Sequence, residues 1–254
     1  MMMTEEHYVE HDNLSLAWGR ALQLVVAPGR TEVVPLVVSI TGFDTQGHPQ
    51  EDSNVRAALD ATLKKSKKHC CHSVANTIFP ESLWNPAKPR KLLYERYWRA
   101  YPKIKRSSKQ NKRGQYFERL ISGGPDGDAN QLEFVLRTFN KSRGHIRRSV
   151  LQAVVFDPRR DHLSWARLGF PCLQHVTFAP EGDGLCVNAF YATQFMVERA
   201  YGNYLGLCRL GRFVAHELKL RLKRVTCFAG IAQFDAKSKA SVQPLLQTVE
   251  HSLR

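Results

Sequence analysis

The order of strand-like and helix-like segments in the C-terminal half limits the fold most strongly. Three segments with strand patterns follow one another, at Ser149–Phe156, His175–Phe178 and Leu185–Tyr191. An amphipathic helix over about Gln194–Leu222 comes next, and a last strand covers Arg224–Phe234. Parallel βαβ folds alternate strands with helices, whereas this order places three strands before one helix. We therefore predict an α+β protein.

Local turn and capping signals extend this prediction. Pro180–Gly184 carries two glycines and an aspartate, which predicts a hairpin turn between the second and third strands. Asp128 and Gln131 have the spacing of a capping box, and apolar residues at helical spacing follow them. We predict a helix over Asp128–Asn140 from this pattern.

The two ends of the chain give weaker patterns. Val33–Ile40 is rich in β-branched residues and predicts a strand, in which Pro35 favours an edge position or a bulge. A short helix is expected at Val55–Lys65. The chain after Phe234 is expected to be a polar tail.

Charge points to anionic partners without choosing among them. The chain has 37 Lys and Arg against 23 Asp and Glu, a formal net charge of +14. Such an excess favours nucleotides, nucleic acid or acidic surfaces. No stretch reaches the roughly 18–20 apolar residues of a membrane span, and Met1–Asn13 lacks the apolar core of a secretory signal. We expect a cytoplasmic protein without a membrane partner.

The six cysteines form no Cys-x-x-Cys pair, so the sequence predicts neither a disulfide framework nor a zinc site. The run His69-Cys70-Cys71-His72 could suggest a metal cluster. Neighbouring cysteines rarely chelate one tetrahedral ion, so we favour a structural role for this run and expect no metal.

Residues 88–113 form the most basic segment, with eleven Lys and Arg interleaved with four aromatic residues. One interpretation is a nucleic-acid surface in which aromatic rings stack on bases. The other, which we favour, is a helix with buried aromatic rings and solvated cations. A mobile basic loop at 103–113 would follow that helix.

A second basic group precedes a candidate nucleophile. Arg143, Arg147 and Arg148 lie in a turn that leads into a strand, and their planar guanidinium groups suit a phosphate. Pro171-Cys172 follows some 24 residues later. A thiol near arginines would have a lowered pKa and would be a better nucleophile. The alternative is an inert core cysteine.

Taken together, the ordered segments resemble the thymidylate synthase superfamily, which includes the pyrimidine-nucleotide hydroxymethylases. The resemblance covers roughly residues 74–235. The matching segments are Gly114-Gln115-Tyr116-Phe117, Asn130-Gln131-Leu132, Ile146-Arg147-Arg148-Ser149, Phe156-Asp157-Pro158, Phe170-Pro171-Cys172, Ala189-Phe190-Tyr191 and Gly202-Asn203-Tyr204.

The resemblance implies a fold and an activity. It implies one domain over residues 1–254, diverged at 1–73, with a mixed sheet, flanking helices and a sheet-to-sheet homodimer. It implies C5 methylation or hydroxymethylation of a pyrimidine nucleotide, with 5,10-methylenetetrahydrofolate as one-carbon donor. Cys172 would attack C6 of the base, because covalent catalysis divides one hard step into easier ones.

The resemblance also assigns roles to other residues. Arg147 and Arg148 would bind the phosphate in the partner subunit, and Asn203 would hydrogen-bond the base. Glu81, in a Glu-x-x-Trp segment, would be the general base. Tyr116 is a further catalytic candidate, and Gln174 and Tyr191 are further substrate-binding candidates.

Departures from the family pattern keep other functions open. Leu173 replaces the His after the catalytic Cys, and Thr193 stands where the family has a phosphate-binding Arg, for which Arg199 is the nearest substitute. Gln233-Phe234-Asp235 replaces His-x-Tyr, and Gln247–Arg254 does not resemble the closing segment. A nucleotide-binding sensor or scaffold is therefore an alternative, and a nucleic-acid-binding protein is a third.

Overall fold

The computed structural model describes residues 7–108, 114–122, 130–141, 146–162 and 170–254. Its strands form one mixed sheet in the order β1-β3-β7-β6-β5-β4, with β2 also paired to β7. The strands are β1 Tyr8–His11, β2 Glu32–Val33, β3 Leu36–Ile40, β4 Gln152–Val154, β5 Leu173–Glu181, β6 Gly184–Phe195 and β7 Arg221–Gln233.

Helices accompany this sheet, and the described α-helices are α1 Leu14–Val26, α2 Ser53–Lys65, α3 Cys71–Ile78, α4 Lys91–Ser107, α5 Tyr116–Leu120, α6 Gln131–Lys141, α7 Pro158–Asp161, α8 Tyr201–Leu218 and α9 Gln243–Leu253. Single turns of other helix types lie between them, namely η1 Glu81–Leu83, η3 Arg148–Val150, η4 Met196–Ala200 and η5 Ala240–Val242. Within the described residues, none of the helices combines the length and the apolar composition needed to cross a membrane.

The α+β prediction is confirmed. β5 and β6 form the predicted antiparallel hairpin, with Glu181 paired to Gly184, and β6 runs parallel to β7 across α8. The helix predicted at Val55–Lys65 is α2, where the Asp52 side chain accepts from the backbone N–H groups of Asn54 and Val55.

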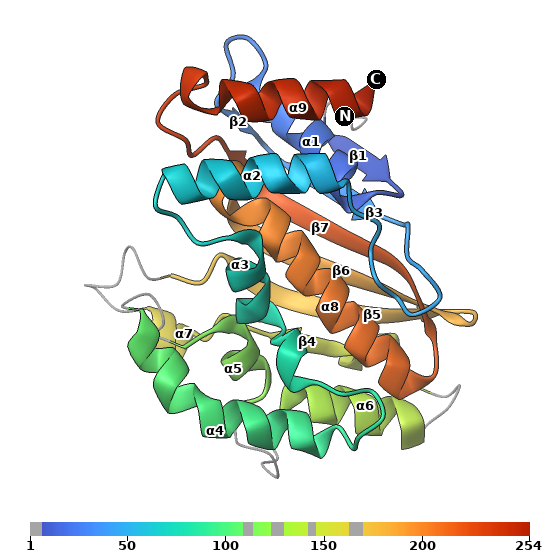
Figure 1. The fold of residues 1–254 in the computed structure, drawn as a ribbon. Coiled ribbons are helices and arrows are strands. Elements are labelled where there is room, and N and C mark those ends of the chain that lie inside the picture. The colour runs from blue at the N-terminus through green and yellow to red at the C-terminus, as the bar shows by residue number, and fades with distance from the viewer. Residues whose placement is uncertain (1–6, 109–113, 123–129, 142–145, 163–169) are drawn as a thin grey trace.

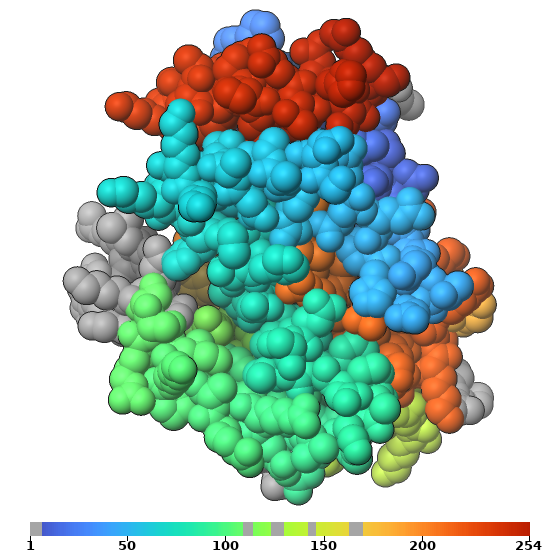
Figure 2. All heavy atoms as spheres, in the orientation of Figure 1, coloured from blue at the N-terminus to red at the C-terminus, as the bar shows by residue number. Residues whose placement is uncertain are grey.

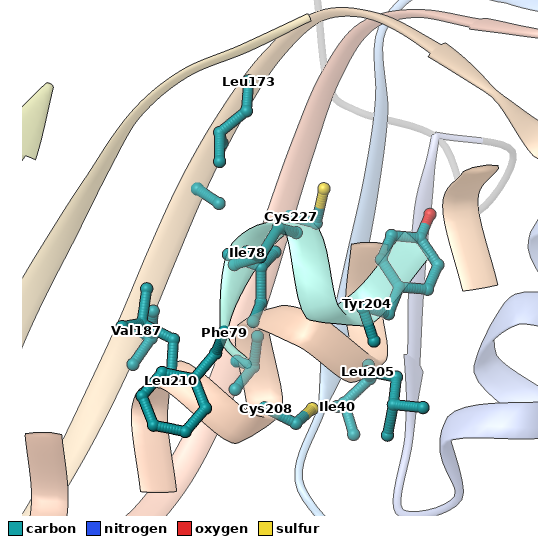
Figure 3. Close-up of a cluster of buried hydrophobic side chains, with 14 of the residues drawn as sticks. Ile40, Ile78, Phe79, Leu173, Val187, Tyr204, Leu205, Cys208, Leu210 and Cys227 are labelled. Atoms are coloured by element: carbon teal, nitrogen blue, oxygen red, sulfur yellow. The ribbon is translucent and has the colours of Figure 1, made fainter. Parts of the chain in front are cut away.

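The main core lies between one face of the sheet and the helices (Figure 1). α1 packs on β1 and β3, and α8 packs on β6 and β7. Figure 3 shows that two strands and two helices contribute side chains to this core: Val187 from β6, Cys227 from β7, Leu210 from α8 and Ile78 from α3. All four side chains are almost fully buried.

Glycines allow the backbone of α8 to lie in direct contact with the backbone of α3. A Cβ at Gly202 would lie 2.8 Å from the Cys71 carbonyl oxygen, and one at Gly206 would lie 2.8 Å from that of Ala75. Real Cβ atoms do not come so close, so larger residues would force the helices apart. This contact fixes α8 between α3 and the sheet.

Two element boundaries in the C-terminal half differ from the predictions. The long helix does not start at Gln194, because β6 pairs with β7 as far as Phe195 and the η4 turn intervenes before α8. The tail after Phe234 is not simply polar. α9 buries Leu245 and Val249 against the α1–α2 side of the molecule, and a Cβ at Gly19 would meet Val249.

Three earlier predictions also need correction. The basic loop does not begin at Lys103, because α4 continues through Pro102 to Ser107, with Ile104 packed against the core. β3 is not an edge strand, and Pro35 lies in the break between β2 and β3. α6 begins at Gln131, where the Asn130 side chain accepts from the Glu133 N–H. Asp128, the turn at 123–127, Arg143, Gly169 and the loop residues 109–113 lie outside the described residues.

Candidate functional site

A cavity of about 490 Å³ opens beside the start of α8. Its walls come from α3, from the turn around η1 and from the C-terminal half of α4. Among the described residues that line it, Arg199 is the one arginine and none carries a carboxylate. The lining also includes His69, Ser73, Leu83, Ile104 and Gln115.

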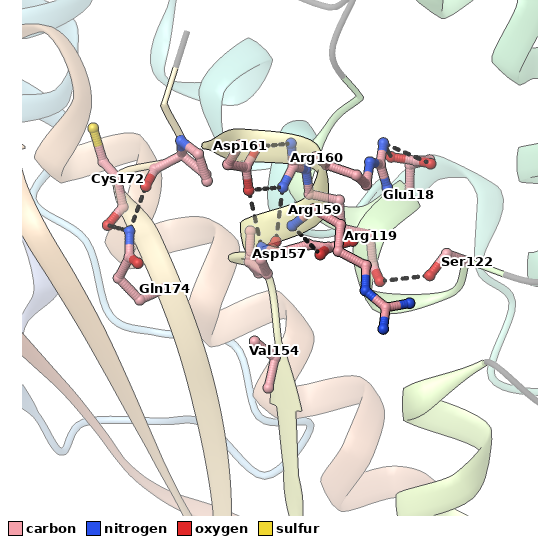
Figure 4. Close-up of polar contacts among 12 residues, drawn as sticks. Glu118, Arg119, Ser122, Val154, Asp157, Arg159, Arg160, Asp161, Cys172 and Gln174 are labelled. Carbon is pink, nitrogen blue, oxygen red and sulfur yellow. Dashed lines mark hydrogen bonds and ion pairs between the residues drawn. The ribbon is translucent and has the colours of Figure 1, made fainter. Parts of the chain in front are cut away.

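Cys172 is held by a β-bulge at the start of β5. Leu173 pairs with Tyr191 and His175 pairs with Phe190, so Gln174 is the extra residue. The Gln174 amide donates to the carbonyl oxygens of Pro171 and Cys172. Figure 4 shows the Cys172 sulfur pointing away from Gln174. Gln174 therefore fixes the backbone around the thiol, and in this structure its amide is bonded to that backbone.

Cys172, Tyr116 and Tyr191 meet, although they lie far apart in the sequence. The Tyr116 hydroxyl lies close to the backbone N–H groups of Cys172 and Leu173, and Tyr191 interacts electrostatically with both Tyr116 and Cys172. Burial raises the pKa of Tyr116 to about 12 and raises that of Tyr191 as well. The buried Tyr191 hydroxyl has no hydrogen-bond partner among the described residues. Two of the predicted site residues thus adjoin the predicted nucleophile.

The thiol is not activated in the single chain. Burial raises the pKa of Cys172, and the nearby Arg199 guanidinium offsets only part of this rise. The lowered pKa that we expected from Arg147 and Arg148 is wrong for one chain, because both residues lie exposed at η3 and neither acts on this thiol. Arg199, which the sequence offered only as a substitute, is the cation that acts on Cys172.

Asp235 positions the segment that carries Arg199. Its carboxylate accepts hydrogen bonds from the backbone N–H groups of Val197 and Glu198, at 2.8 and 3.0 Å. Burial raises the pKa of Asp235, and the two donors offset part of this effect. Asp235, which replaces the last residue of the family's His-x-Tyr, therefore has a structural task here.

Asn203 lies one turn beyond Arg199 and is almost fully buried in α8. Glu81 is held by two arginines. Its carboxylate pairs with Arg209 and Arg212 of α8, at 3.0 and 3.1 Å. The predicted general base is therefore already engaged in two ion pairs.

A buried ion pair supports the Tyr116 side of the site. Arg119 of α5 binds Asp161 of α7 through two hydrogen bonds of 2.7 Å, and it also donates to the Val155 carbonyl oxygen (Figure 4). The two side chains are 5% and 0% exposed. Burial alone would raise the pKa of Asp161, but hydrogen bonds from Arg119 and from the Asp157 N–H hold it below its ordinary value.

The sequence did not reveal several cavity residues. Ser73 carries no motif, and neither the His69–His72 run nor the basic segment that holds Ile104 pointed to a shared cavity, which forms only where residues of α3 and α4 line it together. Gln115 could have been found, because it lies inside the segment that carries Tyr116. Within the described ranges, no group of three His, Cys, Asp or Glu side chains is placed to hold a metal ion, and Cys71 is buried while Cys70 is exposed.

Comparisons with known proteins add no assignment. No protein-family model matches the sequence, and no curated protein matches it significantly.

We predict that Asp161→Asn lowers the free energy of unfolding by about 3–5 kcal/mol, because it leaves the buried Arg119 cation without its partner. Urea unfolding measures this loss. Asp183→Asn is the matched control, since it removes the carboxylate of an exposed pair with Arg221 and should cost under about 1 kcal/mol. Equal losses in the two variants would contradict a supporting role for the buried pair.

The same pair predicts a dependence on pH. The folded-state pKa of Asp161 lies below its unfolded value, so its stabilisation is complete above about pH 4, near the ordinary pKa of Asp. It is lost as the pH falls from there towards the folded-state pKa. The stability difference between the wild type and Asp161→Asn should therefore shrink in acid, and a constant difference would oppose this interpretation.

We predict that Cys172 reacts slowly with iodoacetamide at neutral pH and that its rate rises with an apparent pKa above the ordinary thiol value. Arg199→Gln should move that apparent pKa further upward, whereas Arg137→Gln, on α6, should not move it. The measurement uses peptide-resolved mass spectrometry in a Cys70→Ser background, because Cys70 is exposed and its pKa is lowered by hydrogen bonding to Ser73. An unchanged profile in Arg199→Gln would exclude the proposed electrostatic effect.

Proposed function

We propose that this protein binds a pyrimidine nucleotide monophosphate and transfers a one-carbon unit to C5 of the base, as a methyl or hydroxymethyl group. The observation that carries the proposal is the meeting of Cys172, Tyr116 and Tyr191 beside Arg199, a residue of the cavity wall. These residues come from segments whose order resembles the thymidylate synthase superfamily.

The chemistry begins at the sulfur. The Cys172 thiol loses its proton, and the sulfur forms a bond to C6 while the C5–C6 double bond breaks. The electron pair moves towards C5 and the C4 carbonyl, which makes C5 a nucleophile. After C5 has bonded to the one-carbon unit and lost its proton, the bond from that carbon to the donor nitrogen breaks. A hydride from the tetrahydrofolate would complete a methyl group, or water would complete a hydroxymethyl group, and the carbon–sulfur bond would then break as the double bond returns. Tyr116 and Tyr191 interact with Cys172 and are candidates for moving a proton.

Binding of the nucleotide uses residues around the cavity. Arg199 offers a permanently charged fork for the phosphate, in place of the arginine that the family has where Thr193 stands here. Asn203, one turn further along the chain, would hydrogen-bond the edge of the base. A site that pairs with a base in this way rejects the wrong base by leaving polar groups unpaired.

The uncovered face of the sheet supports the sheet-to-sheet homodimer. His175, Phe190 and Phe228 stack across β5, β6 and β7 with ring centroids 5.8 and 5.3 Å apart. They are only half-buried, and they lie opposite the face on which α1 and α8 pack. A row of aromatic rings on a sheet face suits a second apolar surface. In such a dimer the exposed Arg147 and Arg148 would be available to the partner subunit's site.

The folate donor fits the character of the cavity. Its flat rings need apolar walls, and Val74, Leu83 and Ile104 are apolar residues of the lining. 5,10-Methylenetetrahydrofolate would supply a one-carbon unit ready for attack by C5. The chain's own residues would bind the base and hold it against Cys172.

A nucleotide sensor or scaffold is the second candidate, and three observations favour it. Glu81 is paired with two arginines, the Cys172 pKa is raised, and α9 packs on α1 and α2 at the far end from the cavity (Figure 1). None of the three features prevents a nucleotide from binding. Each, however, would have to change before the reaction could proceed, because catalysis needs a free general base, a thiolate and a segment that closes the site.

Incubation with a 5-fluoropyrimidine nucleotide and 5,10-methylenetetrahydrofolate, followed by intact-mass measurement, tests the proposed reaction. Because fluorine at C5 blocks release, we expect a covalent adduct that Cys172→Ser abolishes. Cys186→Ser, which changes another half-buried cysteine on β6, should leave the adduct intact. Calorimetric binding of nucleotide without any adduct would indicate the sensor, and the absence of both would reject both candidates.

Sedimentation equilibrium tests the dimer. Phe190→Asp places a charge at the centre of the aromatic row and should convert dimers to monomers. Phe134→Asp is the control, because Phe134 is 51% exposed on α6, away from this face. A monomeric wild-type protein, or equal behaviour of the two variants, would reject the proposed interface.

A further inference from the structure

Two clusters of cations lie on segments that also supply residues to the cavity. The α2 cluster lies at the end of α2 and in the loop after it, directly before the cavity residues His69 and Ser73. It consists of Lys64, Lys65, Lys67 and Lys68, all exposed. The α4 cluster lies on the outer side of the helical turns whose inner side supplies Ala100 and Ile104 to the cavity. It consists of Arg99, Lys103, Lys105 and Arg106, all exposed.

The ends of the two helices that carry these clusters lie on the same side of the molecule. Figure 1 shows the C-terminal end of α2, in cyan, above the C-terminal end of α4, in green. Figure 2, in the same orientation, shows side chains at both ends on that flank of the surface. An extended ligand could therefore reach both clusters across the cavity.

These cations are largely without acidic partners. Lys68 pairs with Glu198, but the described part of the chain shows no ion pair for the other seven residues. Elsewhere on the surface, cations do have carboxylates beside them, as in the pairs Arg221–Asp183 and Lys223–Glu181. Like charges held together repel one another, so the two clusters favour a partner with several negative charges.

The shape and chemistry of the region select the kind of polyanion. A mononucleotide carries a single phosphate and needs one or two cations, whereas these clusters offer eight. The recess between them is lined by hydroxyl, amide and apolar side chains, which suit a planar base. A double helix is stiff over about 150 base pairs and keeps its bases paired, so bending it along a concave surface and flipping out a base each cost several kcal/mol. A single strand can do both.

We propose that the α2 cluster, the α4 cluster and the mouth of the cavity between them form a binding surface for single-stranded nucleic acid. The strand's phosphates lie against the two clusters, and an unstacked base enters the recess. This binding is independent of Cys172 chemistry, so it goes beyond the function proposed above.

Fluorescence anisotropy with a labelled oligo(dT) of about 20 nucleotides tests the surface over a range of salt concentrations. Two triple variants, Lys64→Gln/Lys65→Gln/Lys67→Gln and Lys103→Gln/Lys105→Gln/Arg106→Gln, each remove three charges from one cluster. Each lost phosphate contact removes about 0.7 from the salt slope, so each variant should lower that slope by about 2 and weaken binding about 100-fold at ~0.1 M salt.

The control Arg20→Gln/Lys141→Gln/Lys237→Gln removes the same charge from exposed residues on other elements and should bind like the wild type. Circular dichroism confirms that every variant is folded. Cys172→Ser should retain strand binding, which separates this proposal from failure of the proposed reaction. Absent binding, equal weakening in the control, preference for the duplex, or binding only to phosphatidylserine vesicles would each overturn the proposal.

Discussion

The close contact between α8 and α3 is the constraint on which the site depends. At Gly202 and Gly206 the backbone of α8 lies against the carbonyl groups of α3, with no room for side chains. α3 supplies one wall of the cavity, and the η4 turn that leads into α8 supplies Arg199. The distance between these parts of the wall is therefore set by backbone packing, which side-chain rearrangement cannot relax.

Long-range polar contacts then place the reactive groups. Asp235, at the end of β7, holds the turn that carries Arg199, and the Arg119–Asp161 pair holds α5, which begins at Tyr116. The Asp161 carboxylate is deeply buried, that of Asp235 is partly buried, and both accept hydrogen bonds, so each is costly to disturb. The bulge at Gln174 completes the arrangement by orienting the backbone at Cys172.

The state of the thiol connects the proposed reaction to assembly. In one chain, burial outweighs the effect of the Arg199 guanidinium on Cys172 and raises the pKa of the thiol. Arg147 and Arg148 are exposed and act on no group of their own chain's site. In the proposed dimer, these residues of the partner would add positive charge at the nucleotide phosphate. Dimer formation and substrate binding would then both influence the pKa of the Cys172 thiol.

The parts of the fold that the sequence predicted well are those with a local signal. The β5–β6 hairpin has a turn motif, and α2 and α8 have helical periodicity. The boundaries that were wrong depend on distant partners. β6 continues to Phe195 because β7 is there to pair with it, and α9 exists because α1 and α2 offer a surface that buries Leu245.

The candidate site also combines features that the sequence suggested with features that depend on distant partners. The family resemblance assigned Cys172, Tyr116 and Tyr191 to one site, and in the structure these three residues interact electrostatically. Glu81 came from the same resemblance, and in the structure its carboxylate is paired with Arg209 and Arg212. A motif describes only the spacing of residues along the chain. The cations that pair with a carboxylate are those that tertiary packing places near it.

The amino-acid sequence by itself determined the fold class, the hairpin, the helical periodicities and the large positive charge, because each follows from neighbouring residues or from composition. Only the tertiary structure decided which side chains surround the sulfur, which carboxylates are already paired and where unpaired cations collect. Those outcomes depend on contacts between residues tens to hundreds of positions apart. Such contacts form only when the sheet and α8 have fixed the distances between them.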